Sequence, residues 1–463
     1  MAESEPAPLP RFLIAAPASG AGKTILTISL LRALRDKGLR PAAFKCGPDY
    51  IDPLFHREAA GSSGSNLDLF FTNPATVRGL LRRGSAGAGI AVLEGAMGLY
   101  DGIGETTAAS AWRIASETET PVVLAVRPKG AFLSLAAMIQ GFAAFRTPSR
   151  LSGILLTQCP PALYGKLAPV LERETGVTVF GFLPDMPEAS FSSRHLGLIA
   201  PEPGASFDEK TAALAARCRE TIDLDALVSL ARSAPPLAGE LPALSGNAGA
   251  VCRIAVARDA AFCFHYRENL DMLEALGAEL AYFSPLSDQA LPDNAGGLYL
   301  CGGYPELHAR TLSENRAMRG AVAGAVASGM PTLAEGGGFL YLQDSIQDRD
   351  GVAHALCGAI PGNGLKGERL RRFGYVDVTM REDGLLGRAG TCLKGHEFHY
   401  WDSDNCGDAC RAEKPSGGQS WRCVHSSPSL FAGFPHLYFW SNPEAAANFV
   451  RAAAAHQSGG EKT

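Results

Sequence analysis

The stretch RFLIAAPASGAGKTILTISLLRAL, residues 11–34, decides the fold of the N-terminal half of this 463-residue chain. A run of apolar residues, predicted to be a buried strand, leads into a glycine-rich turn, Gly-Lys-Thr and a helical pattern. This order is typical of a phosphate-binding loop, because backbone N–H groups and the helix N-terminus face the anion. Pro17 stands where such loops usually have their first glycine, and a helix capped by a turn of small residues is the simpler alternative.

Two side chains of the loop suit phosphate and metal binding. Lys23 adds a positive charge, and the hydroxyl of Thr24 can bind Mg²⁺. The predicted phosphate-binding residues are Ser19, Gly20, Gly22, Lys23 and Thr24.

Further apolar strands alternate with amphipathic helices on both sides of one linker. The N-terminal half has strands at RFLIAA, AAFKC, GIAVLEG, PVVLAV and GILLTQ, and the C-terminal half at RIAVARD, AELAYFS, GGLYLCGG and PTLAEG. Such alternation predicts two α/β domains, each with a parallel sheet covered by helices. The predicted division is a flexible N-terminus (1–10), a first domain (11–231), a linker (232–250), a second domain (251–452) and a frayed tail (453–463).

Composition narrows the class of protein. Hydrophobic residues make up 46% of the chain and the formal net charge is -5, so the sequence shows no basic excess of the kind that binds nucleic acid or anionic membranes. The eleven cysteines are scattered, no apolar run is long enough for a membrane span, and the N-terminus does not resemble a signal peptide. We therefore expect a cytoplasmic protein whose partners are small molecules or other proteins.

Acidic residues follow two of the predicted strands. Asp49 and Asp52 lie in a turn after AAFKC, Glu94 ends the strand GIAVLE, and Asp101 follows in the next loop. Because ligands bind at the carboxyl ends of parallel strands, these acids are expected to converge on the phosphate loop. The predicted magnesium ligands are Thr24, Asp49 and Glu94. Any single carboxylate here is alternatively a solvated loop residue, and Asp52 is the one that best suits a purely structural role.

Longer motifs resemble those of a known family. Together they resemble the cobyrinic acid a,c-diamide synthases from about residue 11 to about residue 450. The motifs are APASGAGKT, KCGPDYIDPLFH, SNLDLF, EGAMGLYDG, SSRHLGL, ARDAAFCFHYRENLDMLEALGAE, CGGYPELHARTLSEN and GHEFHYW. The resemblance implies a P-loop synthetase domain similar to dethiobiotin synthetase, followed by a class I, triad-type glutamine amidotransferase-like domain.

The activity that this resemblance implies is ATP- and Mg²⁺-dependent amidation of two acetate side chains of a corrin, by way of acyl phosphates. Asp49, Tyr50, Glu94 and Asp101 would then hold the metal and the corrin carboxylate. Thr157 stands where the family usually has an asparagine near the nucleotide base, so the resemblance leaves the base preference open.

The glutaminase motif departs from the family at one residue. The family has AECGG, in which the cysteine attacks the glutamine amide, whereas this chain has AEGGG with Gly336 at that position. His436 in FPHLYF occupies the place of the activating histidine, and Gly302–Glu306 resembles the oxyanion-side loop. Without a nucleophile no thioester can form at this position, so nitrogen is expected from free ammonia or a separate glutaminase.

Several alternatives stay open at this level. Cys301 is a candidate substitute nucleophile, although a buried core thiol is the favoured interpretation. The group Cys406, Cys410, Cys423 and His425 is either a zinc site or, as its irregular spacing favours, a loop of reduced thiols. The substrate is alternatively a sirohydrochlorin or siroheme type of tetrapyrrole, and the chain a non-catalytic ATP-binding regulator. A homo-oligomer is also compatible with the sequence.

Overall fold

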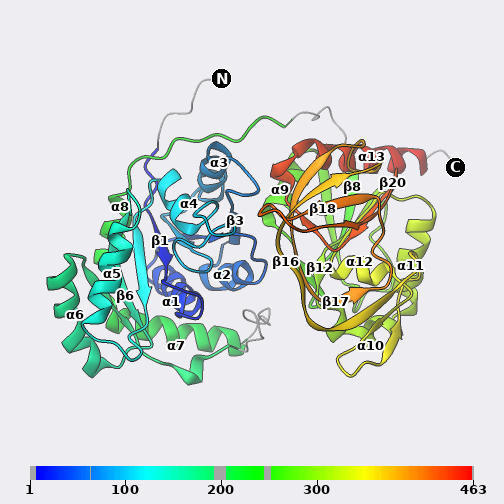
Figure 1. Ribbon diagram of the computed structural model, residues 1–463. Coiled ribbons are helices and arrows are strands. Elements are labelled where there is room, and N and C mark those ends of the chain that lie inside the picture. The colour runs from blue at the N-terminus through cyan, green and yellow to red at the C-terminus, as the bar shows by residue number, and fades with distance from the viewer. Residues whose placement is uncertain (1–6, 63, 192–204, 245–251, 461–463) are drawn as a thin grey trace. The chain divides into compact units, whose positions relative to one another are not determined.

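The chain forms two compact units, Met1–Pro242 and Ala243–Thr463, in a computed structural model (Figure 1). The structure describes residues 7–62, 64–191, 205–244 and 252–460. The division between Pro242 and Ala243 falls inside the segment 232–250, which we predicted to be a linker. The motif SSRHLGL, with His195, lies outside the described residues.

The first unit is built on a seven-stranded sheet, all of whose described pairings are parallel. Its strand order is β3-β2-β4-β1-β5-β6-β7. The strands are β1 (Arg11–Ala15), β2 (Pro41–Cys46), β3 (Gly64–Leu67), β4 (Ile90–Glu94), β5 (Val122–Val126), β6 (Leu151–Thr157) and β7 (Val179–Leu183). The short apolar strands β1, β4 and β5 are buried along their whole length, so hydrophobic burial accounts for the centre of the sheet.

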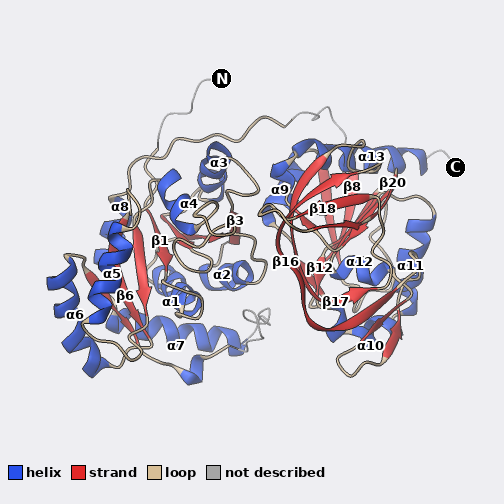
Figure 2. Cartoon of the chain, viewed as in Figure 1, coloured by secondary structure: helices blue, strands red, loops and turns tan. Residues whose placement is uncertain are grey.

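Helices cover both faces of this sheet, as Figure 2 shows. They are α1 (Lys23–Asp36), α2 (Asp52–Ala60), α3 (Pro74–Gly84), α4 (Ala111–Glu117), α5 (Ser134–Ala144), α6 (Pro161–Thr175), α7 (Ala205–Thr221) and α8 (Leu224–Arg232). Helix α1 contacts α2 and α7, while α3 contacts α4 and α5 contacts α6. The chain winds outward in opposite directions from β1, and right-handed crossovers therefore place these groups on opposite faces. Since β2, β4 and β1 are adjacent, the turns that follow them lie together at the carboxyl ends of the strands, where the direction of winding changes.

The second unit has a six-stranded sheet of order β10-β8-β11-β13-β21-β20. Its strands are β8 (Cys252–Ala257), β10 (Ala278–Phe283), β11 (Gly297–Leu300), β13 (Thr332–Glu335), β20 (His425–Ser427) and β21 (Leu430–Gly433). Only the pairing of β20 with β21 is antiparallel among the described pairings of this sheet. The helices of the unit are α9 (Arg267–Ala275), α10 (Ala309–Glu314), α11 (Arg316–Ala327), α12 (Gly337–Leu342) and α13 (Pro443–Gly460).

A second, mainly antiparallel sheet of this unit was not predicted from the sequence. It contains β14 (Ser345–Gln347), β15 (Ala353–Ala355), β16 (Asn363–Met380), β17 (Cys392–Ser403), β18 (Cys410–Glu413), β19 (Ser420–Cys423) and β22 (His436–Leu437). A short ribbon pairs β9 (Phe262–Phe264) with β12 (Gly302–Gly303). The segment between GHEFHYW and FPHLYF, expected to be a loop, thus carries strands β18 to β21.

Described residues near both ends of the chain take part in secondary structure. Helix α13 continues to Gly460, so residues 453–460 are helical instead of a frayed tail. Gln457 holds that end of the helix, because its side-chain oxygen accepts a hydrogen bond from the backbone N–H of Arg253. At the other end, Ala7 forms an isolated bridge with Leu237, although residues 1–10 were expected to be flexible. None of the described helices is both long and apolar enough to cross a membrane.

Candidate active site

The glycine-rich loop after β1 positions a buried lysine at the start of α1. Gly22 precedes the helix with φ of +84°, a conformation that glycine adopts without strain. Lys23 is buried, and its Nζ donates hydrogen bonds to the carbonyl oxygens of Met97 (2.6 Å) and Ala18 (3.3 Å). Burial, and then the nearby charge of Lys45, lower the pKa of Lys23 to about 8. Ser19 and Gly20 lie on the exposed part of the loop.

Thr24 joins two carboxylates that come from different turns of the sheet. Its hydroxyl lies 2.7 Å from Oε1 of Glu94 and 3.2 Å from Oδ2 of Asp52. Lys45 Nζ lies 2.8 Å from the same Glu94 oxygen and 2.5 Å from the same Asp52 oxygen. Lys45 and Glu94 are direct partners in the register of β2 and β4, which explains why they meet. The four side chains form one buried or half-buried cluster beside the phosphate loop.

His56 completes the surroundings of Glu94. Its Nε2 lies 2.7 Å from Oε2 of Glu94, and neither side chain is exposed. Burial alone would raise the pKa of Glu94, but the charge of Lys45 and the hydrogen bond from His56 hold it well below its usual range. Glu94 is therefore an ionised carboxylate with a donor or cation on each oxygen. From the sequence we assigned no role to Lys45 or His56, although both lie within KCGPDYIDPLFH.

The other predicted acids are placed differently. Oδ1 of Asp49 accepts hydrogen bonds from the backbone N–H groups of Ile51 (2.8 Å) and Asp52 (2.9 Å), so Asp49 shapes the turn into α2. Oδ2 of Asp101 accepts one from the N–H of Gly98 (2.8 Å). Tyr50 is buried. The structure thus brings Thr24 and Glu94 together with Asp52, which we had expected to be structural.

This arrangement suits Mg²⁺. A hydroxyl and two carboxylates next to a phosphate-binding loop are hard oxygen ligands, and Mg²⁺ is usually bound by one or two carboxylates together with waters and substrate phosphates. Among the described residues, no three His, Cys, Asp or Glu side chains gather as a metal site. The described residues therefore form no closed cage made only of protein ligands.

Thr157, at the end of β6, contacts the backbone of the phosphate loop. Its hydroxyl donates a hydrogen bond of 2.7 Å to the carbonyl oxygen of Ala21. A β-carbon on Gly22 would come within 3.3 Å of its Cβ, so the loop and this strand end are closely packed. The residue that we considered for contact with the nucleotide base thus braces the loop.

In the second unit, Gly336 forms a sharp turn between β13 and α12. Its φ of +51° and ψ of −111° lie outside the regions that L-residues usually adopt. A β-carbon at this position would lie 2.6 Å from Nε2 of His436, and one on Gly302 would lie 2.1 Å from Cε1 of the same ring. The structure thus places Gly336, Gly302 and His436 next to one another, and their role in one glutaminase site stays a prediction.

Burial governs the protonation of this second site. It lowers the pKa of His436 to about 3, so the imidazole is neutral near pH 7. Glu335, directly before the turn, accepts hydrogen bonds from the backbone N–H of Leu437 and the hydroxyl of Tyr299, both at 2.9 Å. Burial raises the pKa of Glu335 to about 7. A neutral imidazole next to the turn is able to accept a proton, but glycine has none to give.

The cysteines considered as nucleophiles or zinc ligands do not form such sites. Cys301 is fully buried, its thiol donates to the carbonyl oxygen of Ala257 at 3.4 Å, and burial raises its pKa well above the usual value. Cys410 and Cys423 face each other across β18 and β19, while Nε2 of His425 contacts the carbonyl oxygen of Asn405 at 3.1 Å. Within the described part of the chain, the zinc interpretation thus finds no ligand set.

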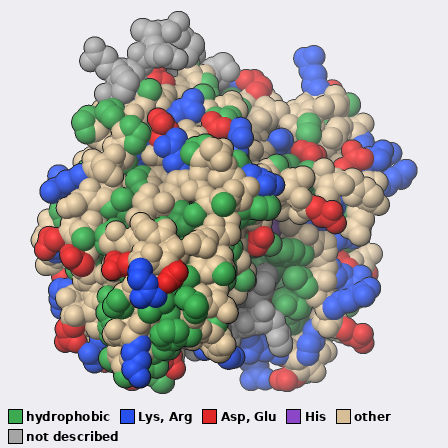
Figure 3. Space-filling model, turned by 60° about the vertical axis from the view of Figure 1, so that its left-hand side comes forward, with side chains coloured by type: hydrophobic (Ala, Val, Ile, Leu, Met, Phe, Trp, Pro, Cys, Tyr) green, Lys and Arg blue, Asp and Glu red, His purple; other side chains and the backbone are tan. Residues whose placement is uncertain are grey.

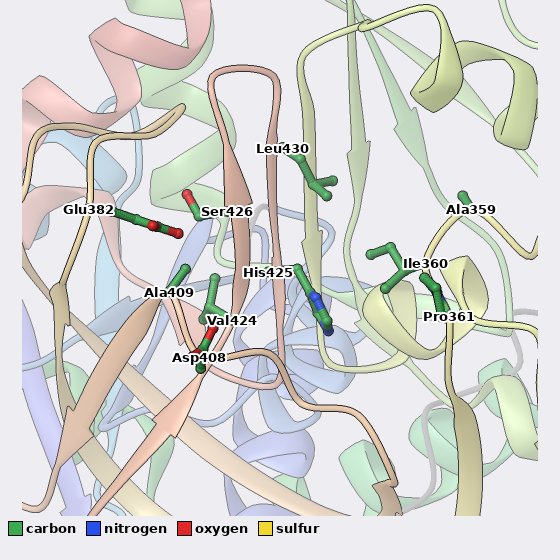
Figure 4. Close-up of a pocket in the computed structure, with 10 residues that line it drawn as sticks. All are labelled: Ala359, Ile360, Pro361, Glu382, Asp408, Ala409, Val424, His425, Ser426 and Leu430. Carbon is green, nitrogen blue, oxygen red and sulfur yellow. The ribbon is translucent and has the colours of Figure 1, made fainter.

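A shallow cavity of about 330 Å³ lies elsewhere in the second unit (Figure 4). Its lining is Ala359, Ile360, Pro361, Glu382, Asp408, Ala409, Val424, His425, Ser426 and Leu430. None of the residues around the Gly336 turn contributes to it. On the molecular face in Figure 3, acidic and basic side chains are interspersed, in keeping with the small net charge of -5.

Comparisons with known proteins cover both units. Residues 12–198 match the family described as the CobQ/CobB/MinD/ParA nucleotide binding domain, and residues 253–444 match the CobB/CobQ-like glutamine amidotransferase domain.

Similar curated proteins extend over nearly the whole chain. A cobyrinate a,c-diamide synthase of Dehalococcoides mccartyi is 37% identical over 96% of this chain and 98% of its own length. Those of Syntrophotalea carbinolica and Salmonella typhimurium are 38% and 36% identical over 95% and 96% of this chain, and each aligns over 98% of its own length.

Proposed function

The chain belongs to the cobyrinate a,c-diamide synthase family, and on that premise we propose that it amidates the a- and c-acetate carboxylates of a cobyrinate-type corrin. Members of this family are ligases of cobalamin biosynthesis with a nucleotide-binding domain and a glutamine amidotransferase domain. We further propose that the reaction uses ATP and Mg²⁺ and proceeds through acyl phosphates.

One observation carries the proposal: the contact of the Thr24 hydroxyl with both Glu94 and Asp52, one residue after the phosphate-loop lysine. This places two carboxylates and a hydroxyl where they can hold a metal ion against nucleotide phosphates. Bound ATP supplies the γ-phosphoryl group. A substrate carboxylate oxygen forms a bond to that phosphorus while the bond to ADP breaks, and Lys23 neutralises the charge that develops.

The second step needs a nitrogen nucleophile. The nitrogen of ammonia attacks the acyl carbon, the carbon–oxygen bond to phosphate breaks, and the ammonia nitrogen releases a proton to solvent. The protein mainly positions the reactants and excludes water. Thr24 and Glu94 stay our proposed metal ligands. We propose Asp52, which contacts Thr24, as the third ligand in place of Asp49, which accepts backbone hydrogen bonds in the turn into α2. Tyr50 and Asp101 are proposed to face the corrin carboxylate.

Gly336 makes free ammonia the proposed nitrogen source. A glutaminase of this type needs a thiolate that forms a thioester with glutamine, and the turn that would present it has no side chain. His436 is next to the turn and neutral, so the base is present without a nucleophile. Ammonia produced by a separate glutaminase would serve equally well.

The experiment is amide formation on cobyrinic acid with ATP and Mg²⁺, in which ammonium chloride and glutamine are compared. Product with ammonium alone supports both parts of the proposal. Product with glutamine as well would contradict the argument from Gly336. If neither nitrogen source gives product with cobyrinic acid but sirohydrochlorin is amidated, the corrin assignment is wrong; if neither tetrapyrrole reacts, the chain is a non-catalytic relative.

A further inference from the structure

His56 contacts a proposed magnesium ligand although the chemistry described so far does not use it. It lies in α2, and its Nε2 is 2.7 Å from Oε2 of Glu94 at the end of β4. Both side chains are fully buried. A buried carboxylate must be matched by donors, so this contact is part of what allows Glu94 to remain ionised inside the unit.

The hydrogen-bond partners of His56 show which ring nitrogen donates to Glu94. Nδ1 of His56 has no hydrogen-bond partner among the described residues. Because ionised Glu94 can only accept, the hydrogen of this contact belongs to Nε2. His56 thus donates through Nε2 to one oxygen of Glu94.

The two oxygens of Glu94 face different groups. Oε1 lies 2.7 Å from the Thr24 hydroxyl and 2.8 Å from Lys45 Nζ, on the side of the phosphate loop. Oε2 faces His56. The last torsion of a glutamate side chain has only a broad preference, so a carboxylate without a fixed partner rotates readily. His56 is that fixed partner, and it contacts Oε2 instead of the oxygen on the side of the phosphate loop.

We propose that His56 is a positioning residue for magnesium: its Nε2–H holds Oε2 of Glu94 so that Oε1 is directed at the Thr24 hydroxyl and the metal. The inference rests on the magnesium–nucleotide site of the proposed function, but it is independent of the tetrapyrrole substrate. Outer partners of this kind typically change metal affinity by about 10- to 100-fold when they are removed.

The test measures binding and not turnover. The full chain is titrated by calorimetry with the β,γ-imido analogue of ATP, once with saturating Mg²⁺ and once with EDTA, and the ratio of the two dissociation constants gives the magnesium-dependent gain. His56→Phe keeps a planar ring but removes the donor. We expect the magnesium-dependent gain of this variant to be smaller than that of the wild type by about tenfold or more, while its nucleotide affinity in EDTA is unchanged.

Two amide variants form a matched pair that separates positioning from packing. The His56→Gln side chain can place an N–H near the position of Nε2, whereas that of His56→Asn is one methylene shorter. We expect His56→Gln to keep most of the magnesium-dependent gain and His56→Asn to lose it, a comparison that also serves if His56→Phe does not fold.

The inference is wrong if His56→Gln and His56→Asn have the same magnesium-dependent gain in nucleotide affinity. It is also wrong if a variant loses the same amount of nucleotide affinity with Mg²⁺ as with EDTA. A wild-type chain without any magnesium-dependent gain would also overturn it. Failure of the corrin assignment has a different signature: cobyrinic acid is not amidated, yet the variants still differ in magnesium-dependent nucleotide binding.

Discussion

His436 lies so close to Gly336 that a β-carbon on the glycine would come within 2.6 Å of the imidazole Nε2. The imidazole therefore occupies space next to the turn that any side chain at this position would need. Since burial keeps the ring neutral, one of its two nitrogens has a lone pair that can accept a proton. If His436 is the glutaminase base, as we propose, only the nucleophile at Gly336 is lacking, and restoring one is the direct test.

Gly336→Cys is expected to restore release of glutamate from glutamine. His436 must shift to admit the new side chain, and the φ of +51° adds strain that typically costs about 1–3 kcal/mol for a residue other than glycine. The measurements are glutamate release and the free energy of unfolding. Gly336→Ala introduces the same strain without a thiol and should release none. A folded cysteine variant that is equally inactive would show that the unit has lost more than its nucleophile.

Lys23→Ala is expected to abolish amidation and to leave the fold intact. Among the described residues, Lys23 Nζ donates its hydrogen bonds to backbone carbonyl oxygens, so its removal leaves no carboxylate unpaired there. Loss of a charge that stabilises a transferring phosphoryl group typically lowers kcat by about 100- to 1000-fold. Lys37→Ala is the control, because this lysine follows the same helix but pairs with Asp225. Retained activity in Lys23→Ala would contradict the phosphate-loop assignment.

Asp52→Asn and Asp49→Asn are expected to have different effects. Asp52 contacts the Thr24 hydroxyl, so its amide variant should need more Mg²⁺ for nucleotide binding, by about tenfold. Oδ1 of Asp49 accepts two backbone N–H groups, so Asp49→Asn should mainly lower stability, by about 1 kcal/mol. Magnesium titrations and thermal unfolding distinguish the two. The reverse pattern would return the metal to Asp49 and leave Asp52 as a structural residue.

Glu335→Gln is expected to change how stability depends on pH. Burial raises the pKa of Glu335 to about 7 from its ordinary 4.5, so the unfolded chain releases this proton first as the pH rises. The contribution of Glu335 to stability is therefore complete below about pH 4.5 and lost by about pH 7, with an upper bound of roughly 3 kcal/mol.

The difference between wild type and Glu335→Gln isolates this contribution. The lowered pKa values of His396 and His436, about 3 in both cases, make stability rise with pH over much of the same range, and they are common to both proteins. Urea unfolding between pH 4.5 and 7.5 would measure the difference curve. A flat difference across that range would mean that Glu335 is already ionised in the folded protein.

Cys301 is expected to resist alkylation in the folded protein. It is fully buried and its thiol pKa is raised, whereas the side chain of Cys392 is exposed. Since only an accessible thiolate reacts, iodoacetamide near pH 8 should label Cys392 and spare Cys301 until urea is added. Peptide mass spectrometry reads the sites. Rapid labelling of Cys301 without urea would make it a candidate nucleophile again.

The fold was predictable where local pattern and burial agree. The apolar strand, glycine turn and helix of residues 11–38 have the predicted order, because each part follows from local periodicity. Strand β3 was missed because GSNL is short and half polar. The motif GHEFHYW in β17 has the alternation of a strand, but its long partner β16 was missed. Glycines and charged residues interrupt the alternation of much of β16, and its register with β17 shifts near Arg371.

The sequence by itself determined the fold class, and it indicated the phosphate loop and the glycine at position 336 where the resembling family has a cysteine, because these depend on residue type and on neighbours along the chain. Only the tertiary structure decided which side chains meet at the metal site. Lys45 and Glu94 are 49 residues apart and touch because β2 and β4 are adjacent in the sheet. Asp52 contacts Thr24 because α2 begins at that residue, and the same helix brings His56 to Glu94. Strand order and helix position are products of packing, which no local pattern specifies.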